Sequence, residues 1–254
     1  MKLPLPLLCA VIAIVHGVSG QSSNFSVFDK KKTPSPVGKV ADDSGLPKPE
    51  IHLAFDELSA GTTPNTGKSQ IKVTVAGCEL VAGKIGKALD FSGEDCKVTL
   101  GPDFSKTISD TYTIAVWVFP HNQKQFGTIF NSKIFYGVNL RFQGDKIDLN
   151  TGGRWNLISS EAKAIPNAEW THVAVTNDGS SAAIYVNGKL VGEKNTAARV
   201  SMDVTAELGQ RVGAEADTGI AKPAEVLNAS IDDLRVYTAV LTPEQIADLA
   251  KVPK

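Results

Sequence analysis

The chain has 254 residues, 26 of them basic and 27 acidic, so its formal net charge is −1 at pH 7. Binding to nucleic acid depends on an excess of Lys and Arg that neutralises phosphates, and this chain has none. Nucleic acid is therefore excluded as the expected partner.

The first 20 residues have the pattern of an export signal. Lys2 gives a short positive start, an apolar run extends from Leu3 to Val18, and small residues precede Gln21. The run contains His16 and is short for a membrane span, which needs about 20 residues. We expect residues 1–20 to be cleaved, leaving a secreted, periplasmic or cell-surface protein without a membrane span. The alternative is a retained membrane anchor.

Residues 21–48 are predicted to form a flexible linker, because they combine lysines, prolines and small polar residues with little apolar material to bury. The alternative is contact between Lys30–Lys32 and an anionic surface. Residues 49–254 are predicted to form a single domain, a normal size for one β-sandwich.

Short β-rich runs follow one another through this domain at a spacing of roughly ten residues, which is typical of sandwiches. The runs lie at 51–57, 71–75, 88–91, 97–100, 111–119, 128–131, 135–142, 146–150, 155–159, 206–212 and 226–237. Residues 169–192 add three strands joined by turns at Asn177–Ser180 and Asn187–Gly188. Asn-Gly favours a type I′ hairpin turn because both central residues need positive φ. The pattern indicates an all-β sandwich.

One helix is predicted near the C-terminus. Thr242 suits the N-cap position, Pro243 the first helical position, and Gln245 completes a capping box. Ile246 and Leu249 then mark one apolar face, which we expect to pack on the sandwich.

Two cysteines, Cys78 and Cys96, remain after removal of the signal. An exported protein meets an oxidising compartment, so a disulfide between them is the expected state. Two buried free thiols are the alternative. A catalytic or metal-binding role is disfavoured because neither cysteine lies in a C-x-x-C pair or near a histidine.

Five segments carry a family resemblance. They are Gly86–Phe91 (GKALDF), Thr113–Val118 (TIAVWV), Glu169–Val175 (EWTHVAV), Ile184–Gly188 (IYVNG), and Ile231–Tyr237 with Leu241–Ile246 (IDDLRVY and LTPEQI). In this order they resemble laminin-G-like domains of the concanavalin A-like lectin/glucanase superfamily. The resemblance covers residues 51–250 and implies a two-sheet antiparallel jelly-roll sandwich with one short C-terminal helix. It implies no single activity, because the superfamily includes lectins, adhesion modules, hydrolases and structural domains.

The laminarinase-type hydrolases of that superfamily carry an E-x-D-x-x-E motif, which places three carboxylates on one face of a strand. Glu215-Ala216-Asp217 begins this pattern, but Thr218-Gly219-Ile220 follows and no second glutamate arrives. The histidines show no zinc-binding spacing. We therefore expect no catalytic activity. The alternative is a glycoside hydrolase whose two carboxylates come from distant loops.

The resemblance also implies a structural calcium ion where the loop after the first strand meets the last strand. Asp232 occupies the matching position, and Asp56 and Glu57 are possible contributors. Calcium takes several oxygen ligands and is common in extracellular modules. The alternative is that Asp232 and Asp233 bind neighbouring backbone groups or face solvent.

A sugar-binding face needs aromatic rings for stacking and planar polar groups for hydroxyls. The candidate ligand-binding residues are Trp155, Arg154, Asn156, Tyr136, Asn139 and Arg141. Trp155 is the candidate platform because it follows two glycines and stands between Arg154 and Asn156, while the other three lie along a neighbouring strand. The favoured alternative is that Trp155 is a partly buried sandwich residue. Trp117 and Trp170 are expected to be core residues, because both lie in apolar strands that resemble the family's core strands.

These features predict an exported, non-catalytic binding module for carbohydrate or for a cell-surface or extracellular protein. A hydrolase and a purely structural module are the alternatives. Asn24 and Asn228 begin glycosylation sequons, which matter only if the source organism modifies such sites.

Overall fold

The computed structural model of the protein describes residues 45–93, 95–132, 136–153, 156–196, 200–203, 205–211 and 225–251. All of them belong to one compact unit, Lys31–Lys254. The predicted export signal, the linker up to residue 44 and the Glu215–Asp217 segment lie outside the described residues. In the described part of the chain, no helix is long and apolar enough to cross a membrane.

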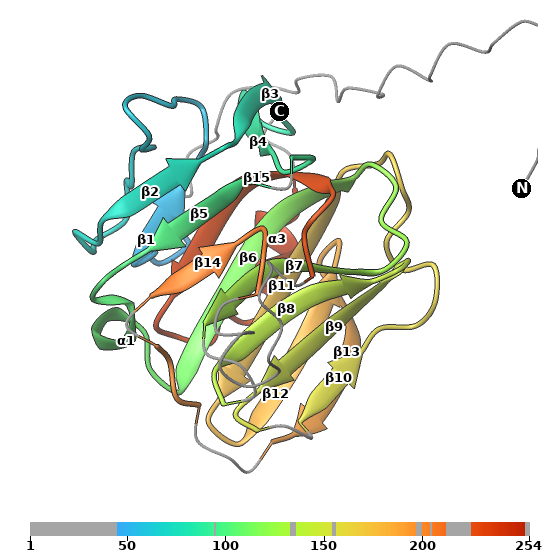
Figure 1. The fold of residues 1–254 in the computed structure, drawn as a ribbon. Helices are drawn as coiled ribbons and strands as arrows, with labels where there is room; N and C mark the ends of the chain where they lie inside the picture. Colours follow the sequence, from blue (N-terminus) through green and yellow to red (C-terminus); the bar gives the residue numbers. More distant parts are fainter. Residues whose placement is uncertain are drawn as a thin grey trace, which may run out of the picture. The chain divides into compact units, whose positions relative to one another are not determined.

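Two antiparallel β-sheets form the domain, which confirms the predicted sandwich (Figure 1). The eight-stranded sheet contains, in spatial order, β13 (Lys189–Asn195), β12 (Ser181–Val186), β11 (Thr171–Asp178), β6 (Thr111–Pro120), β15 (Ala229–Tyr237), β4 (Lys87–Asp90) and β3 (Glu79–Ala82), with β1 (Ile51–Leu53) paired to β15. The seven-stranded sheet contains β10 (Leu157–Ser159), β9 (Lys146–Thr151), β8 (Val138–Gln143), β7 (Phe126–Ser132), β14 (Ala206–Leu208), β5 (Lys97–Leu100) and β2 (Val73–Ala76). Two short helices, α1 (Phe104–Thr107) and α3 (Pro243–Leu249), accompany the sheets among the described residues.

The hydrophobic core lies between the two sheets, because successive side chains of a strand point to opposite faces. In β8, Val138, Leu140 and Phe142 are fully buried in the core. Asn139 and Arg141 alternate with them and therefore point away from the core. We call the face of each sheet that is turned away from the core its outer face.

Helix α3 packs on the outer face of the eight-stranded sheet. Ala115 of β6 and Ala174 of β11 lie directly opposite each other there, and their small side chains leave room for Ile246 of the helix. The predicted capping box is confirmed: Gln245 N donates to Thr242 Oγ1 at 3.3 Å and Thr242 N donates to Gln245 Oε1 at 3.0 Å.

The predicted hairpin between β12 and β13 is also confirmed. Asn187 and Gly188 have φ values of +48° and +77°, as a type I′ turn requires. A Cβ atom at Gly188 would lie 2.9 Å from the Cα of Ala247, so the turn and helix α3 are in close contact.

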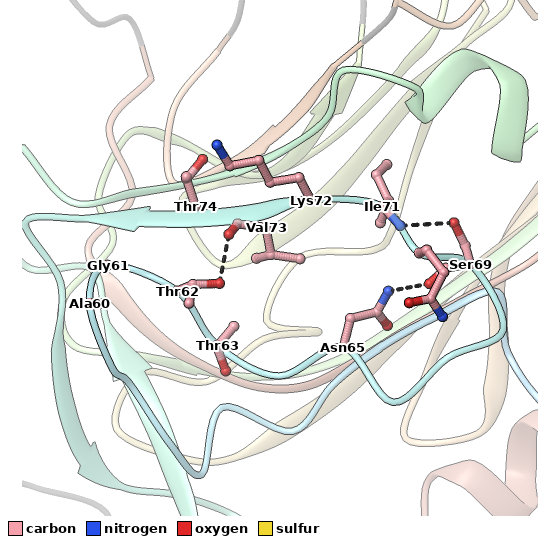
Figure 2. Close-up of a pocket in the computed structure, with 11 residues that line it drawn as sticks. Ala60, Gly61, Thr62, Thr63, Asn65, Ser69, Ile71, Lys72, Val73 and Thr74 are labelled. Atoms are coloured by element: carbon pink, nitrogen blue, oxygen red, sulfur yellow. Dashed lines mark hydrogen bonds between the residues drawn. The ribbon is translucent and has the colours of Figure 1, made fainter.

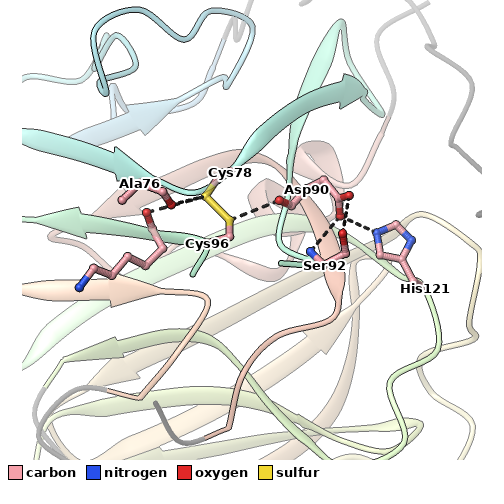
Figure 3. The surroundings of a disulfide bond; sticks show 7 residues. Ala76, Cys78, Asp90, Ser92, Cys96 and His121 are labelled. Atoms are coloured by element: carbon pink, nitrogen blue, oxygen red, sulfur yellow. Dashed lines mark hydrogen bonds and ion pairs between the residues drawn. A yellow bond between two sulfur atoms is a disulfide. The ribbon is translucent and has the colours of Figure 1, made fainter. Parts of the chain in front are cut away.

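The predicted disulfide joins Cys78 and Cys96 (Figure 3), with 18 residues of sequence separation. Strands β2 and β5 belong to the seven-stranded sheet, whereas β3 and β4, between them in the chain, belong to the other sheet. The disulfide therefore closes the base of a hairpin that leaves one sheet, extends the other and returns. Beside it, Asp90 of β4 pairs with His121 Nε2 at 2.8 Å.

Trp117 is buried, as expected, but it lies on the outer face of the eight-stranded sheet and not between the sheets. The reason is that side chains alternate along β6: Val116 and Val118, on either side of Trp117, fill the core, so Trp117 points to the opposite face. Trp117 packs edge-on against His172, which lies opposite it on β11, with ring centroids 5.2 Å apart. His172 Nδ1 is buried and has no hydrogen-bond partner among the residues that the structure describes.

Burial lowers the pKa of His172 from 6.5 to about 4. Between these values the unfolded chain binds a proton that the native chain excludes, so the free energy of unfolding should fall as the pH falls from 6.5 to about 4. We predict that His172→Gln removes this part of the pH dependence. Urea denaturation of both proteins at about pH 7 and about pH 4 measures it. Equal losses of stability in the two proteins would contradict the assignment.

Candidate functional site

The outer face of the seven-stranded sheet carries an unusual row of amide side chains. Asn131 of β7 lies directly opposite Asn139 of β8, and Asn139 lies opposite Asn150 of β9. We call these three residues the amide row. Glu207 continues the row, because it lies opposite Asn131 on β14, the strand that borders β7 on the side away from β8.

Strand β7 reaches this face through an irregularity. Its register against β8 shifts between Thr128 and Phe130, so Ile129 is an extra residue. Ile129 and Phe130 are both buried in the core. Residues three apart normally face opposite sides of a strand. The bulge allows both Thr128 and Asn131 to point to the outer face.

Two members of the amide row, Asn131 and Asn139, are buried yet incompletely bonded. Asn131 is 0% exposed and Asn139 7% exposed. Both the Oδ1 and Nδ2 atoms of Asn131, and the Oδ1 atom of Asn139, have no hydrogen-bond partner among the described residues. An unpaired polar group away from water is destabilising. Such groups mark this part of the outer face as a candidate binding site.

A second row of polar side chains, the charged row, runs beside the first. Thr128, Arg141, Asp148 and Ser159 lie opposite one another on β7, β8, β9 and β10. Asp148 is fully buried. Its Oδ1 accepts a hydrogen bond of 2.7 Å from Ser159 Oγ, and its Oδ2 lies 3.6 Å from Arg141 Nη2.

Glu225 completes this arrangement. Arg141 Nη1 donates to Glu225 Oε1 at 2.7 Å, and Thr128 Oγ1 donates to Glu225 Oε2 at 3.1 Å. The Arg141 guanidinium also lies over the Phe126 ring, 4.2 Å from its centroid. Glu225 could not be predicted from the sequence, because it is 97 residues from Thr128 and belongs to no recognisable motif.

The structure describes four of the six predicted ligand-binding residues, and it places them at three separate positions. Asn139 and Arg141 share the outer face of β8. Tyr136 precedes that strand and does not belong to it; its side chain is exposed, and its carbonyl accepts from Ser201 N at 2.7 Å. Asn156 Nδ2 donates to the Thr196 carbonyl at 2.9 Å. Arg154 and Trp155 lie outside the described residues.

The candidate calcium ligands surround the turn between β3 and β4. Asp232 Oδ2 accepts from Ile85 N at 2.8 Å, and Asp56 Oδ1 accepts from Lys87 N at 2.8 Å. Glu57 is exposed, and neither of these two hydrogen bonds involves it.

Two glycines make this arrangement possible. A Cβ atom at Gly83 would lie 2.7 Å from Asp232 Oδ2, and one at Gly86 would collide with Asp56 Oδ1. The turn therefore leaves space for the two carboxylates, and a side chain at either glycine would occupy that space. We call this arrangement the glycine cradle.

The Asp232 carboxyl is the more unusual of the two. Its Oδ1 is buried and has no hydrogen-bond partner in the part of the chain that the structure describes. Burial, with a smaller effect of the neighbouring charges of Asp233 and Asp56, raises the pKa of Asp232 to about 8. A bound cation would stabilise the charged carboxylate and so oppose that shift. The described residues contain no group of three or more acidic, His or Cys side chains suited to a metal, so these two carboxylates would need backbone or water oxygens as well.

A hydroxyl–imidazole–carboxylate chain lies at a third place. Thr66 Oγ1 lies 2.8 Å from His52 Nδ1, and His52 Nε2 lies 2.8 Å from Asp233 Oδ1. Nucleophilic catalysis would also require donors for an oxyanion. The amides nearest Thr66 are engaged, since Thr66 N donates to the His52 carbonyl and Gly67 N donates to Asn65 Oδ1. The arrangement matches a structural network.

A pocket of about 460 Å³ lies at the free edge of β2 (Figure 2). The loop that lines it also covers the edge: Val75 N donates to the Gly61 carbonyl at 2.7 Å, and Thr62 Oγ1 donates to the Val73 carbonyl at 2.8 Å. Exposed sheet edges favour aggregation unless they are covered. The loop therefore has a protective role that accounts for its contacts.

Known structures share this architecture at low sequence identity. Domain 4 of AbnA, an extracellular GH43 arabinanase from Geobacillus stearothermophilus solved in complex with arabinotriose, is 20% identical with a TM-score of 0.59, and the match covers 80% of this chain and 98% of that one. The ligand binding domain of botulinum neurotoxin serotype D, in complex with N-acetylneuraminic acid, is 15% identical with a TM-score of 0.61, covering 80% and 50%.

The binding domain of Paraclostridial Mosquitocidal Protein 1 is 13% identical with a TM-score of 0.62, covering 80% and 52%. The chain thus spans about half the length of the two toxin domains. At these identities the likeness establishes the fold. The sequence model Laminin_G_3, of the concanavalin A-like lectin/glucanases superfamily, matches residues 92–247. The chain belongs to this family.

Proposed function

We propose that the protein is an exported, non-catalytic module that binds carbohydrate through the outer face of its seven-stranded sheet. The observation that carries the proposal is the buried amide row, where Asn131 and Asn139 have unpartnered polar atoms on one face. Sugar hydroxyls both donate and accept hydrogen bonds, so they satisfy amide oxygens and amide nitrogens alike. A ligand with hydroxyls on adjacent carbons matches two neighbouring amides.

Stacking surfaces accompany the polar rows. Phe126, the first residue of β7, is 39% exposed, and Tyr136, which precedes β8, is 58% exposed. Aromatic rings of this kind suit the apolar face of a sugar. Trp155 remains the predicted platform from sequence, with Arg154 and Asn156 beside it.

The similar structures support this ligand class. The arabinanase domain and the neurotoxin domain, solved with arabinotriose and with N-acetylneuraminic acid, share the fold of this chain. Arabinotriose is uncharged, whereas N-acetylneuraminic acid carries a carboxylate. The fold is therefore compatible with both kinds of ligand, and the side chains of the outer face determine which kind binds.

The geometry favours binding over hydrolysis. A glycoside hydrolase needs one carboxylic acid that donates its proton to the leaving oxygen and a second carboxylate across the bond. Asp148, in the charged row, and Glu225, beside it, both lie against the guanidinium of Arg141. The two carboxylates are therefore directed at the same cation and not at opposite sides of a bound sugar. An extracellular protein ligand is the second candidate, which the experiment below separates from a glycan.

We also propose that a structural Ca²⁺ ion binds at Asp232 and Asp56. The unpartnered, buried Asp232 Oδ1 and the glycine cradle at Gly83 and Gly86 support this site. The ion would supply positive charge where two carboxylates approach the same turn, and would hold the β3–β4 hairpin against β15. Glu57 is exposed and contributes least to the proposal.

The direct test of the main proposal is glycan-array binding by the full chain, with calcium and again with a chelator. Asn139→Ala should weaken binding about tenfold, because one buried hydrogen-bonding partner is lost. Asn195→Ala, an exposed site on β13 of the other sheet, is the matched control and should bind normally. A folded protein that binds no glycan would contradict the proposal and favour a protein ligand or a structural role.

The amide row should lower the stability of the ligand-free protein. We predict that Asn131→Leu, a substitution of similar volume, raises the free energy of unfolding by about 1–2 kcal/mol while weakening glycan binding. Urea denaturation and the glycan assay measure the two effects. A clear loss of stability would show that the Asn131 amide is fully bonded in the native protein, contrary to our interpretation.

Calcium should stabilise the protein through Asp232. At a hundredfold excess over its Kd, the ion adds about 2.7 kcal/mol to the free energy of unfolding and raises Tm. Asp232→Asn should abolish that increase, whereas the exposed Asp248→Asn control in α3 should retain it. Thermal denaturation with calcium and with chelator provides the comparison. The calcium proposal fails if the wild-type Tm is the same in both conditions.

A further inference from the structure

We propose that the outer face of the seven-stranded sheet selects uncharged glycans, and that Glu225 excludes acidic sugars by pairing with Arg141. This inference rests on the proposed glycan-binding function and adds the charge class of the ligand. It concerns a residue, Glu225, that no sequence motif identifies.

Arg141 is the basic residue of the two rows, and its guanidinium is already engaged. Arg141 Nη1 donates to Glu225 Oε1 at 2.7 Å, and Arg141 Nη2 lies 3.6 Å from Asp148 Oδ2. One face of the guanidinium lies over the Phe126 ring. Arginine binds a sugar carboxylate best through two parallel N–H groups. Here an acidic sugar would have to displace Glu225 to reach them.

A second guanidinium is held by the same carboxylate. Arg211 Nη1 lies 3.4 Å from Glu225 Oε1, the atom that accepts from Arg141. Glu225 therefore stands between the two arginines that border the rows. Its loss would leave both cations facing the same space.

The position of Glu225 is tightly determined. Its carbonyl accepts from Thr128 N at 2.7 Å, and its Oε2 accepts from Thr128 Oγ1 at 3.1 Å. Its backbone has φ of +57°, a region that residues other than glycine rarely occupy. Such strained conformations persist where surrounding contacts hold them, often at functional sites. The contacts with Thr128 and Arg141 are therefore specific.

The charge balance of the described side chains favours neutral ligands. Arg141 and Arg211 provide two positive charges against three negative charges from Asp148, Glu207 and Glu225, which leaves a net charge of −1 in and against the two rows. A carboxylate brought onto the two rows meets this net negative charge and finds Arg141 and Arg211 already paired with Glu225, whereas a neutral sugar meets no such repulsion. Lys97 and Lys146 begin their strands at the ends of the face, outside the rows.

The test uses matched ligands: a neutral oligosaccharide and the same oligosaccharide carrying a terminal sialic acid or a uronic acid. We expect the wild-type full chain to bind the neutral form at least about tenfold more tightly, as measured by isothermal titration calorimetry. Glu225→Gln frees the Arg141 donors and adds one unit of positive charge to the face. Binding of the acidic form should then rise by about tenfold and weaken at high salt.

Glu193→Gln on β13 is the matched control, because it changes the net charge equally on the other sheet and should leave the preference unchanged. Asp148→Asn, which frees the other side of the same guanidinium, is a second variant if Glu225→Gln does not fold. The comparison of the two ligands on the wild-type protein needs no variant.

The outcomes separate the two proposals. Equal or tighter binding of the acidic form by the wild-type protein overturns this inference and leaves glycan binding intact. A folded Glu225→Gln protein with no gain for the acidic form also overturns it. No binding of either form by the folded wild-type protein overturns the glycan-binding proposal itself.

Discussion

The alternation of side chains along a β-strand is the constraint on which the rest of the structure depends. Because Val138, Leu140 and Phe142 must fill the core, Asn139 and Arg141 are placed on the outer face of β8. The same rule acts on β7 and β9, and antiparallel register then aligns the outward residues into rows. The candidate site is thus a product of core packing and strand pairing together.

That site is held at a thermodynamic cost which the rest of the domain offsets. Within the described part of the chain, buried polar atoms of Asn131 and Asn139 on this face lack hydrogen-bond partners. Two features stabilise the domain and offset this cost. They are the continuous apolar core between the two sheets and the disulfide that ties the β3–β4 hairpin to the seven-stranded sheet. Among the described residues, the eight-stranded sheet also has buried polar atoms without hydrogen-bond partners, at His172 and Asp232, but on the seven-stranded sheet Asn131 and Asn139 lie directly opposite each other.

Much of the fold was predictable because its signals are local. The Asn187–Gly188 turn, the Thr242 capping box and the strand series each depend on a few consecutive residues, and the family resemblance ordered them correctly. The Cys78–Cys96 pair followed from there being two cysteines in a chain expected to be exported.

The candidate site was only partly predictable because it depends on contacts between distant segments. Asn139 and Arg141 were singled out on their own strand, but Asn131 and Asn150 join them through register, which no local pattern specifies. Glu225 reaches Arg141 across 84 residues of sequence. A bulge at Ile129 determines which side of β7 faces outward.

The most direct test of this account is to observe the amide row itself while a glycan binds. The side-chain NH₂ groups of Asn131, Asn139 and Asn150 give separate signals in a ¹⁵N-correlated NMR spectrum of the full chain. Titration with a neutral oligosaccharide that binds should shift these signals first, with the Arg141 side chain, and leave the β2 edge and β13 unchanged. If the shifts instead cluster at the β2 edge or on the eight-stranded sheet, the outer face of the seven-stranded sheet is not the binding surface.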